Sequence, residues 1–218
     1  MIAPFRLQAG DRVPVQQSTT TCGSASLTVA RMLVDPAFAR WIRLGVDKDA
    51  KDDDVPDAHT VEQRFAAHEQ VVARRTNALV GAGGRIQFPW PRALGTPPWG
   101  AIGELEYGAA VPWADYDIEW FRFVRSSTLE ESYASLQRRV RDGRPALLYI
   151  GNTWLPRHVV LVMPATRGQE LDVYEPSIGR VIDLPKDGFV ERRLRIAGWD
   201  VPWGAVWDDA PHRDTVTP

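Results

Sequence analysis

Cysteine and histidine are scarce in this sequence, which limits the chemistry that it can carry. The 218 residues include one cysteine, Cys22, and four histidines, His59, His68, His158 and His212. A single cysteine cannot form an internal disulfide, and the histidines are too far apart in the chain to make a Cys/His zinc motif with it. We therefore expect no bound metal, and nothing in the sequence indicates another cofactor.

An excess of charge of one sign is also absent. The chain has 26 basic and 28 acidic side chains and a net charge of −2, which argues against a nucleic-acid interface or a polybasic membrane surface. No apolar run approaches the roughly 20 residues of a membrane span, and residues 1–6 do not begin a secretory signal. We expect one cytoplasmic domain over residues 1–207 and a flexible tail over 208–218, with no nucleic-acid or membrane partner. The oligomeric state stays open.

The single cysteine stands where a helix is expected to begin. Residues 27–34 form an apolar run that predicts a short buried helix, and Cys22 lies just before it. At a helix N-terminus, unpaired backbone N–H groups and the positive end of the helix dipole favour a negatively charged thiolate. Cys22 is therefore a candidate nucleophile. Gly23 would let a substrate carbonyl approach the backbone, and Gln16, six residues before the thiol, could direct its amide toward an oxyanion.

His158 is the candidate base. It opens an apolar run, residues 158–163, that predicts a β-strand, and it follows Cys22 by 136 residues. In papain-like chains that interval is roughly 130–150 residues. An imidazole on a strand facing the thiol could accept its proton and later protonate a leaving amine. Taken alone, His158 fits better as an edge-strand residue bound to a backbone carbonyl, so the catalytic interpretation depends on the other residues.

Two acids on the next predicted strand, residues 171–175, could orient the imidazole. Glu175 lies 17 residues beyond His158, and Asp172 lies three residues before Glu175. Because side chains alternate along a strand, an odd offset places the two carboxylates on opposite faces. We therefore expect only one of them, or a third group not yet identified, to serve His158.

The segment around the cysteine resembles the active-site segment of papain-like cysteine peptidases, most closely the C39-like branch. That branch carries a glutamine six residues before a Cys-Gly-x-Ala helix start. The matching residues here are Gln16, Cys22, Gly23 and Ala25. Thr21 departs from the pattern, because the bacteriocin-processing members usually have an acidic residue at this position.

A second match follows the predicted histidine strand. Residues 174–179 resemble the Asp-Pro-x-x-Gly segment of C39-like peptidases, with a glutamate in place of the aspartate. Over about residues 12–190, the resemblance implies an α+β papain-like fold, in which N-terminal helices pack on a C-terminal antiparallel sheet. It also implies cleavage of a peptide or another amide substrate. The catalytic residues that it implies are Cys22, His158, Glu175 and the oxyanion donor Gln16.

Two other functions are compatible with these residues. A transglutaminase-like acyltransferase uses the same cysteine, histidine and acid, and differs in passing the acyl group to an amine instead of water. A non-catalytic binding module on the same fold would keep Cys22 as an inert buried thiol.

The remaining pattern predicts helices followed by strands. Helices are predicted at 36–45, at 61–79 after a capping box, and from a second capping box at 128–131 to about residue 143. Strands are predicted at 117–124, 144–151, 158–163, 171–175 and 180–184. Closely spaced strands without intervening helices favour an antiparallel sheet. His68 falls on the apolar stripe of the helix predicted at 61–79, as a packing residue would.

Three stretches have unusual compositions. Residues 47–54 are rich in aspartate but lack the glycine and closing glutamate of an EF-hand, so they predict a solvated, mobile loop. Residues 81–108 are rich in glycine, proline and tryptophan and predict a long inserted loop. Trp90 and Trp99 either line a substrate groove there or pack the loop onto the domain. The tryptophans within residues 199–207 are expected to cover the sheet.

Overall fold

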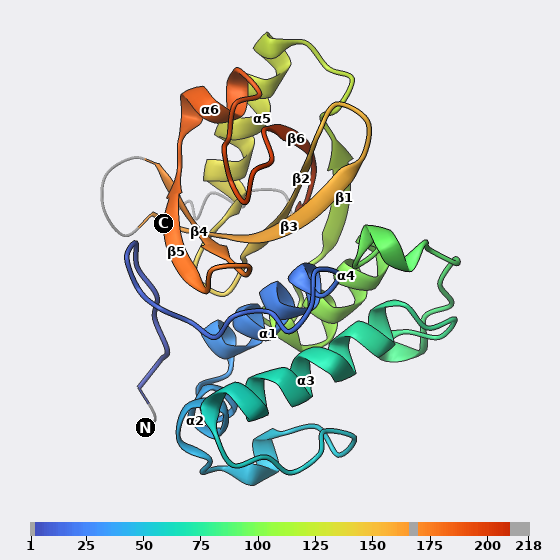
Figure 1. Cartoon of the computed structure of the whole chain (residues 1–218), viewed down its shortest axis with the longest axis vertical. Coiled ribbons are helices and arrows are strands. Elements are labelled where there is room, and N and C mark those ends of the chain that lie inside the picture. Colours follow the sequence, from blue (N-terminus) through green and yellow to red (C-terminus); the bar gives the residue numbers. More distant parts are fainter. Residues whose placement is uncertain (1–2, 166–169, 210–218) are drawn as a thin grey trace, which may run out of the picture.

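The protein consists of a helical layer and a β-sheet, as Figure 1 shows. The computed structural model describes residues 3–165 and 170–209. The helices are α1 (Cys22–Val34), α2 (Pro36–Leu44), α3 (Val61–Thr76), α4 (Pro98–Glu104), α5 (Ser126–Arg139) and α6 (Lys186–Val190). The strands are β1 (Tyr116–Trp120), β2 (Ala146–Gly151), β3 (Pro156–Met163), β4 (Leu171–Glu175), β5 (Arg180–Leu184) and β6 (Val201–Asp208).

The strands form one antiparallel sheet in the order β1-β6-β2-β3-β4-β5. Alternating strand residues face two cores. Leu147 and Tyr149 of β2 face the core beneath α1 to α4, and Leu148 and Ile150 face the core beneath α5 and α6. Figure 1 shows the two groups of helices on opposite sides of the sheet. The predicted α+β class, with N-terminal helices packed on an antiparallel sheet, is confirmed.

The sequence did not predict β6 as a strand. The tryptophan-rich residues expected to cover the sheet instead enter it between β1 and β2. Val206 faces the core beneath α1, while Ala205 and Trp207 face the core beneath α5. Because both faces of β6 are covered, the polar alternation that identifies a half-exposed strand is missing.

The end of β6 also corrects the predicted boundary of the tail. The predicted flexible tail begins at residue 208, but Asp208 is the last residue of β6 and is buried in an ion pair with Arg144. The rest of that predicted tail, from residue 210 onward, lies outside the described residues.

Helix α1 is the central element of the helical layer, with α3 on one side and β3 on the other (Figure 1). Its first turns consist of the small residues 23–26, which let the helix approach its neighbours closely. Ser26 donates its hydroxyl to the carbonyl of Val159 on β3 at 3.4 Å. As predicted, the helix begins at Cys22.

The capping boxes in the sequence predict the start of one helix correctly and that of another incorrectly. The capping box of Thr60 and Gln63 opens α3 as predicted, although the helix ends at Thr76 instead of residue 79. Helix α5 begins at Ser126, before the predicted capping box, and no described side chain caps it. In the described ranges, no helix is both long and apolar enough to cross a membrane.

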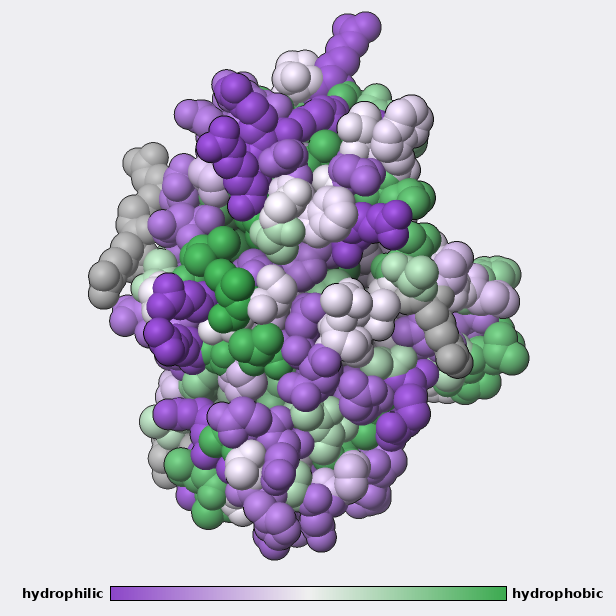
Figure 2. Space-filling model, in the orientation of Figure 1, coloured by the Kyte–Doolittle hydropathy of each residue, from purple (hydrophilic) through white to green (hydrophobic). Residues whose placement is uncertain are grey.

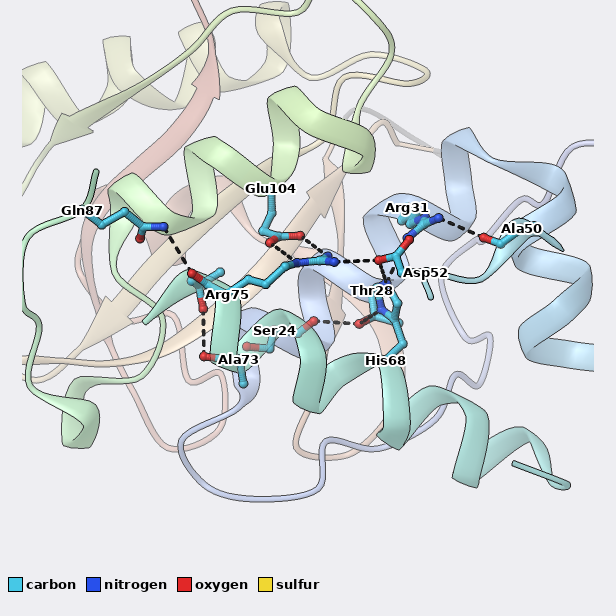
Figure 3. Close-up of polar contacts among 11 residues, drawn as sticks. Ser24, Thr28, Arg31, Ala50, Asp52, His68, Ala73, Arg75, Gln87 and Glu104 are labelled. Carbon is cyan, nitrogen blue, oxygen red and sulfur yellow. Dashed lines mark hydrogen bonds and ion pairs between the residues drawn. The ribbon is translucent and has the colours of Figure 1, made fainter. Parts of the chain in front are cut away.

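The aspartate-rich loop is held in place by two helices. Asp52 accepts hydrogen bonds from Arg31 on α1 at 2.5 Å and from Arg75 on α3 at 2.7 Å. Arg75 also makes a two-point contact with Glu104 on α4, at 2.8 and 2.7 Å. Figure 3 shows this row of charges running from the loop to α4. Lys48, Asp49, Asp53 and Asp54 are exposed, in agreement with the predicted solvated loop, whereas the paired arginines hold Asp52. The mobility of the loop stays a prediction.

The segment predicted as a long loop, residues 81–108, contains regular structure. Proline-initiated α4 forms within it and runs into a π-helical turn over Leu105–Ala109. The rings of Trp90 and Trp99 pack edge to face with centroids 5.1 Å apart, so these tryptophans pack the segment together. Figure 2 shows hydrophobic surface at the right-hand edge, over the stretch before α4. Its exposed apolar side chains are Leu79, Val80, Ile86 and Phe88.

Arg75→Gln tests whether the row of charges stabilises the helical layer. The change leaves Glu104, whose side chain is 8% exposed, without its charged partner. Breaking a largely buried ion pair is strongly destabilising, so we expect the free energy of unfolding in urea to fall by about 2 kcal/mol or more.

Arg74→Gln is the matched control, because Arg74 is exposed and makes no ion pair within residues 3–165 and 170–209. Its effect on the free energy of unfolding should stay within about 0.5 kcal/mol. Equal losses in the two variants would contradict the role given to Arg75.

Candidate active site

Cys22 is the first residue of α1 and is 2% exposed. No described side chain makes a capping hydrogen bond at Thr21. The backbone N–H groups of the first helical turn, including that of Cys22, therefore have no intrahelical partner and are available to an incoming oxygen. The thiol stands at the positive end of a buried helix, where a negative charge is favoured.

A histidine and a glutamate complete the group around the thiol. Nε2 of His158 lies 2.6 Å from Oε1 of Glu175, and both residues are buried. The same carboxylate accepts the N–H of Ser177 at 2.9 Å, the hydroxyl of Ser177 at 2.7 Å and the N–H of Ile178 at 3.2 Å. These donors fix the carboxylate at the end of β4, and the carboxylate fixes the ring of His158.

The charges in this group stabilise one another. Burial alone lowers the pKa of His158, but hydrogen bonding and charge attraction from Cys22 and Glu175 outweigh it and raise the pKa to about 9. Burial raises the pKa of Glu175, but its hydrogen bonds with His158 and Ser177 lower the pKa overall. Since Nε2 faces Glu175, Nδ1 is the ring nitrogen left for the thiol. The geometry favours an imidazolium between sulfur and carboxylate at neutral pH.

Of the two candidate acids, Glu175 faces the imidazole. Asp172 lies near the opposite end of β4 and is buried. The intervening residues show the alternation, because Val173 belongs to the core beneath α5 and Tyr174 to the core beneath α1. The structure therefore brings together Cys22, His158 and Glu175, and leaves Asp172 away from the histidine.

Gln16 lies beside the acid, and its side chain is bound within its own loop. Its backbone N–H donates to the carbonyl of Pro176 at 2.9 Å, which ties the loop before Cys22 to the turn after Glu175. Its Nε2 donates to the carbonyl of Ser18 at 2.7 Å. This bond uses one of the two N–H groups of the amide, and Oε1 is buried without a hydrogen-bond partner among the described residues. The role of Gln16 as an oxyanion donor stays a prediction.

Glu69 on α3 is a residue of the site that the sequence analysis missed. Its carboxylate accepts the N–H of Gln17 at 3.0 and 3.3 Å and hydrogen-bonds the side chain of Thr21. Burial raises the pKa of Glu69, and these hydrogen bonds offset part of the effect. Glu69 thus holds both ends of the loop that leads into α1. The available signal was a carboxylate next to His68 on the apolar stripe of α3, where a charged group needs a partner.

The segment before α4 covers the thiol. A Cβ at Gly23 would lie 2.6 Å from the side chain of Thr96. This contact requires the glycine, because Thr96 fills the space that a side chain at position 23 would occupy. The approach of a substrate carbonyl to the backbone of Gly23 stays a prediction. Tyr149 donates its hydroxyl to the carbonyl of Thr96 at 3.1 Å. A Cβ at Gly95, which has a φ of +73°, would lie 3.9 Å from Sγ of Cys22. Gly95 and Thr96 therefore form a wall beside the thiol.

The second buried histidine belongs to the row of charges, as Figure 3 shows. The ring nitrogens of His68 lie 3.0 Å from the hydroxyl of Thr28 and 3.2 Å from the guanidinium of Arg31. Burial, followed by the charge of Arg31, lowers the pKa of His68 to about 3. His68 is therefore a neutral packing residue, as predicted, and it is fully buried.

In the part of the chain that the structure describes, no group of three or more histidine, cysteine or acidic side chains is placed to hold a metal ion.

Comparison with known proteins leaves the family open. No protein-family model and no curated protein matches the sequence. A solved structure that does match is that of the Pseudomonas avirulence protein AvrPphB, with 13% identity and a TM-score of 0.45 over 88% of this chain and 94% of that chain. Similarity at this level does not establish a C39-like family, so function is inferred from the site residues.

NMR of the two buried histidines tests the charge arrangement at the site. At neutral pH we expect an imidazolium signal from His158 and a neutral-ring signal from His68, because their pKa values are about 9 and about 3. The stability that protonated His158 contributes is complete below the ordinary histidine pKa of 6.5 and is lost as the pH rises through about 9. Cys22→Ala should move the titration of His158 to lower pH. A neutral His158 at neutral pH would contradict its pairing with the thiol.

Proposed function

We propose that this protein is a papain-like cysteine hydrolase that cleaves an amide bond. The observation that carries the proposal is the buried group of Cys22, His158 and Glu175, in which the imidazole lies 2.6 Å from the carboxylate. Three separate elements, α1, β3 and β4, supply a nucleophile, a proton carrier and an orienting acid. Acyl transfer through a covalent intermediate requires these three roles.

In the first half of the reaction, Sγ of Cys22 attacks the carbonyl carbon of the substrate as a thiolate. The carbonyl oxygen becomes an oxyanion, and the backbone N–H of Cys22 and the free amide N–H of Gln16 stabilise it. His158 gives its Nδ1 proton to the leaving nitrogen as the carbon–nitrogen bond breaks. An amine departs, and a thioester remains on Cys22.

In the second half, water replaces the amine. His158 takes a proton from the water as the water oxygen bonds to the carbonyl carbon of the thioester. The carbon–sulfur bond then breaks, a carboxylic acid leaves, and the imidazolium and thiolate are restored. Glu175 orients the ring and offsets its positive charge without itself taking the proton.

The two alternatives differ from this proposal in testable ways. A binding module with an inert thiol gains little from a buried imidazole and carboxylate, because desolvating such a pair costs free energy. A transglutaminase-like enzyme shares the first half of the reaction and uses an amine in the second. Product analysis in water, with and without an added primary amine, separates hydrolysis from acyl transfer.

Glu175→Gln and Asp172→Asn, compared on one fluorogenic peptide amide, test the assignment of the acid. Glu175→Gln should lower kcat/KM by about a hundredfold or more, because the imidazolium loses the negative charge that stabilises it. The fold should survive, since the amide oxygen still accepts one set of donors, at a loss of about 1 kcal/mol in the free energy of unfolding. Asp172→Asn should leave turnover nearly unchanged.

Cys22→Ser provides the blank rate for both variants. A large loss confined to a folded Asp172→Asn protein would transfer the orienting role to Asp172. Full activity in both variants would leave a mechanism without an orienting carboxylate, contrary to the proposal.

A further inference from the structure

A cavity beside the thiol bears on the substrate that this site accepts. The cavity has a volume of about 500 Å³ and lies between the loop before α1 and the C-terminal turns of α3. Gly95 forms another side of it, and a Cβ at Gly95 would lie 3.9 Å from Sγ of Cys22. Gly95 therefore borders both the thiol and the cavity.

The proposed mechanism places the cavity on the acyl side of the scissile bond. Helix α1 separates α3, which lines the cavity, from β3, which carries His158 (Figure 1). Because His158 protonates the leaving nitrogen, the amine half of the substrate lies toward β3. The acyl half therefore extends in the opposite direction, toward the cavity.

The lining of the cavity is polar and contains one charged side chain, that of Arg74. None of the described residues that line it is acidic. The hydroxyl and amide groups of the lining come from Ser18, Thr20, Thr21, Gln70 and Asn77. Thr21 and Asn77 already donate to backbone carbonyls, so donors for a ligand come from Gln70 and from the paired hydroxyls of Ser18 and Thr20. Such a surface suits an anion that accepts several hydrogen bonds.

The fold uses the other arginines of α3, whereas it leaves Arg74 available. Arg64 donates to two backbone carbonyls at 2.8 and 2.7 Å, and Arg75 is paired with two carboxylates. Glu69, on the same helix, is turned toward the loop before α1. Arg74 is exposed and forms no ion pair with a described residue. Its place near the helix C-terminus complements the helix dipole, but that interaction does not occupy its five N–H donors.

We propose that the cavity binds an acidic side chain on the acyl side of the scissile amide, through Arg74. An aspartate or glutamate would form a charge-assisted pair with the guanidinium, and the hydroxyl and amide groups would complete its hydrogen bonds. This assignment rests on the proposed function and adds the class of substrate, a peptide with an acidic residue next to or near the acyl carbon.

A positional library of peptide amides with a fluorogenic amine tests the assignment, because only the acyl side varies in such a library. At one position the wild-type protein should prefer aspartate or glutamate over asparagine or glutamine by on the order of tenfold in kcat/KM. The preference should weaken as salt is added. Arg74→Gln should remove both the preference and its salt dependence, and Arg74→Glu should favour lysine at that position.

Arg138→Gln is the matched control, because Arg138 is exposed on α5, beyond the opposite face of the sheet. It should retain the acidic preference, and urea unfolding should show that each variant is folded. No acidic preference in the wild type, or the same preference in Arg74→Gln, would overturn the role of the cavity while leaving the proposed function intact. No turnover of any peptide above the Cys22→Ser blank would instead overturn the proposed function and this assignment together.

Discussion

The hydrogen bond between His158 and Glu175 is the interaction on which the proposed chemistry depends. At 2.6 Å, in a buried setting, it fixes the orientation of the imidazole and directs Nδ1 toward Cys22. Neither group has enough water around it to be stable as an isolated charge, so each stabilises the charged form of the other. The donors from Ser177 and Ile178 keep the carboxylate in place while the ring exchanges protons.

The fold brings three distant segments to this bond. Antiparallel pairing of β3 with β4 returns the chain so that Glu175 meets His158, and the small residues of α1 let the helix carrying Cys22 lie against β3. The hydrogen bond from Gln16 to Pro176 joins the loop before the helix to the turn after the acid. The row of charges holds α1 through Arg31, in the C-terminal half of the helix. The reactive Cys22 is at the opposite end.

Features set by local order could be predicted from the sequence. The position of Cys22 at a helix start follows from the apolar run after it, and the separation of Asp172 from Glu175 follows from strand alternation. The ordering of Asp52 and the placement of β6 could not be predicted, because both depend on partners far away in the chain. Glu69 was missed for the same reason, since Gln17, whose N–H it accepts, precedes it by 52 residues in the chain.

The rate at which iodoacetamide alkylates Cys22 tests the central claim most directly. The residue is 2% exposed, so an inert thiol would react more slowly in the folded protein than in the urea-unfolded chain. Because the thiolate is the reactive form, pairing with His158 predicts the opposite, a rate about tenfold or more above that of the unfolded chain just below neutral pH. His158→Ala should remove this advantage. Slower alkylation of the folded wild type than of the unfolded chain would contradict a nucleophilic Cys22.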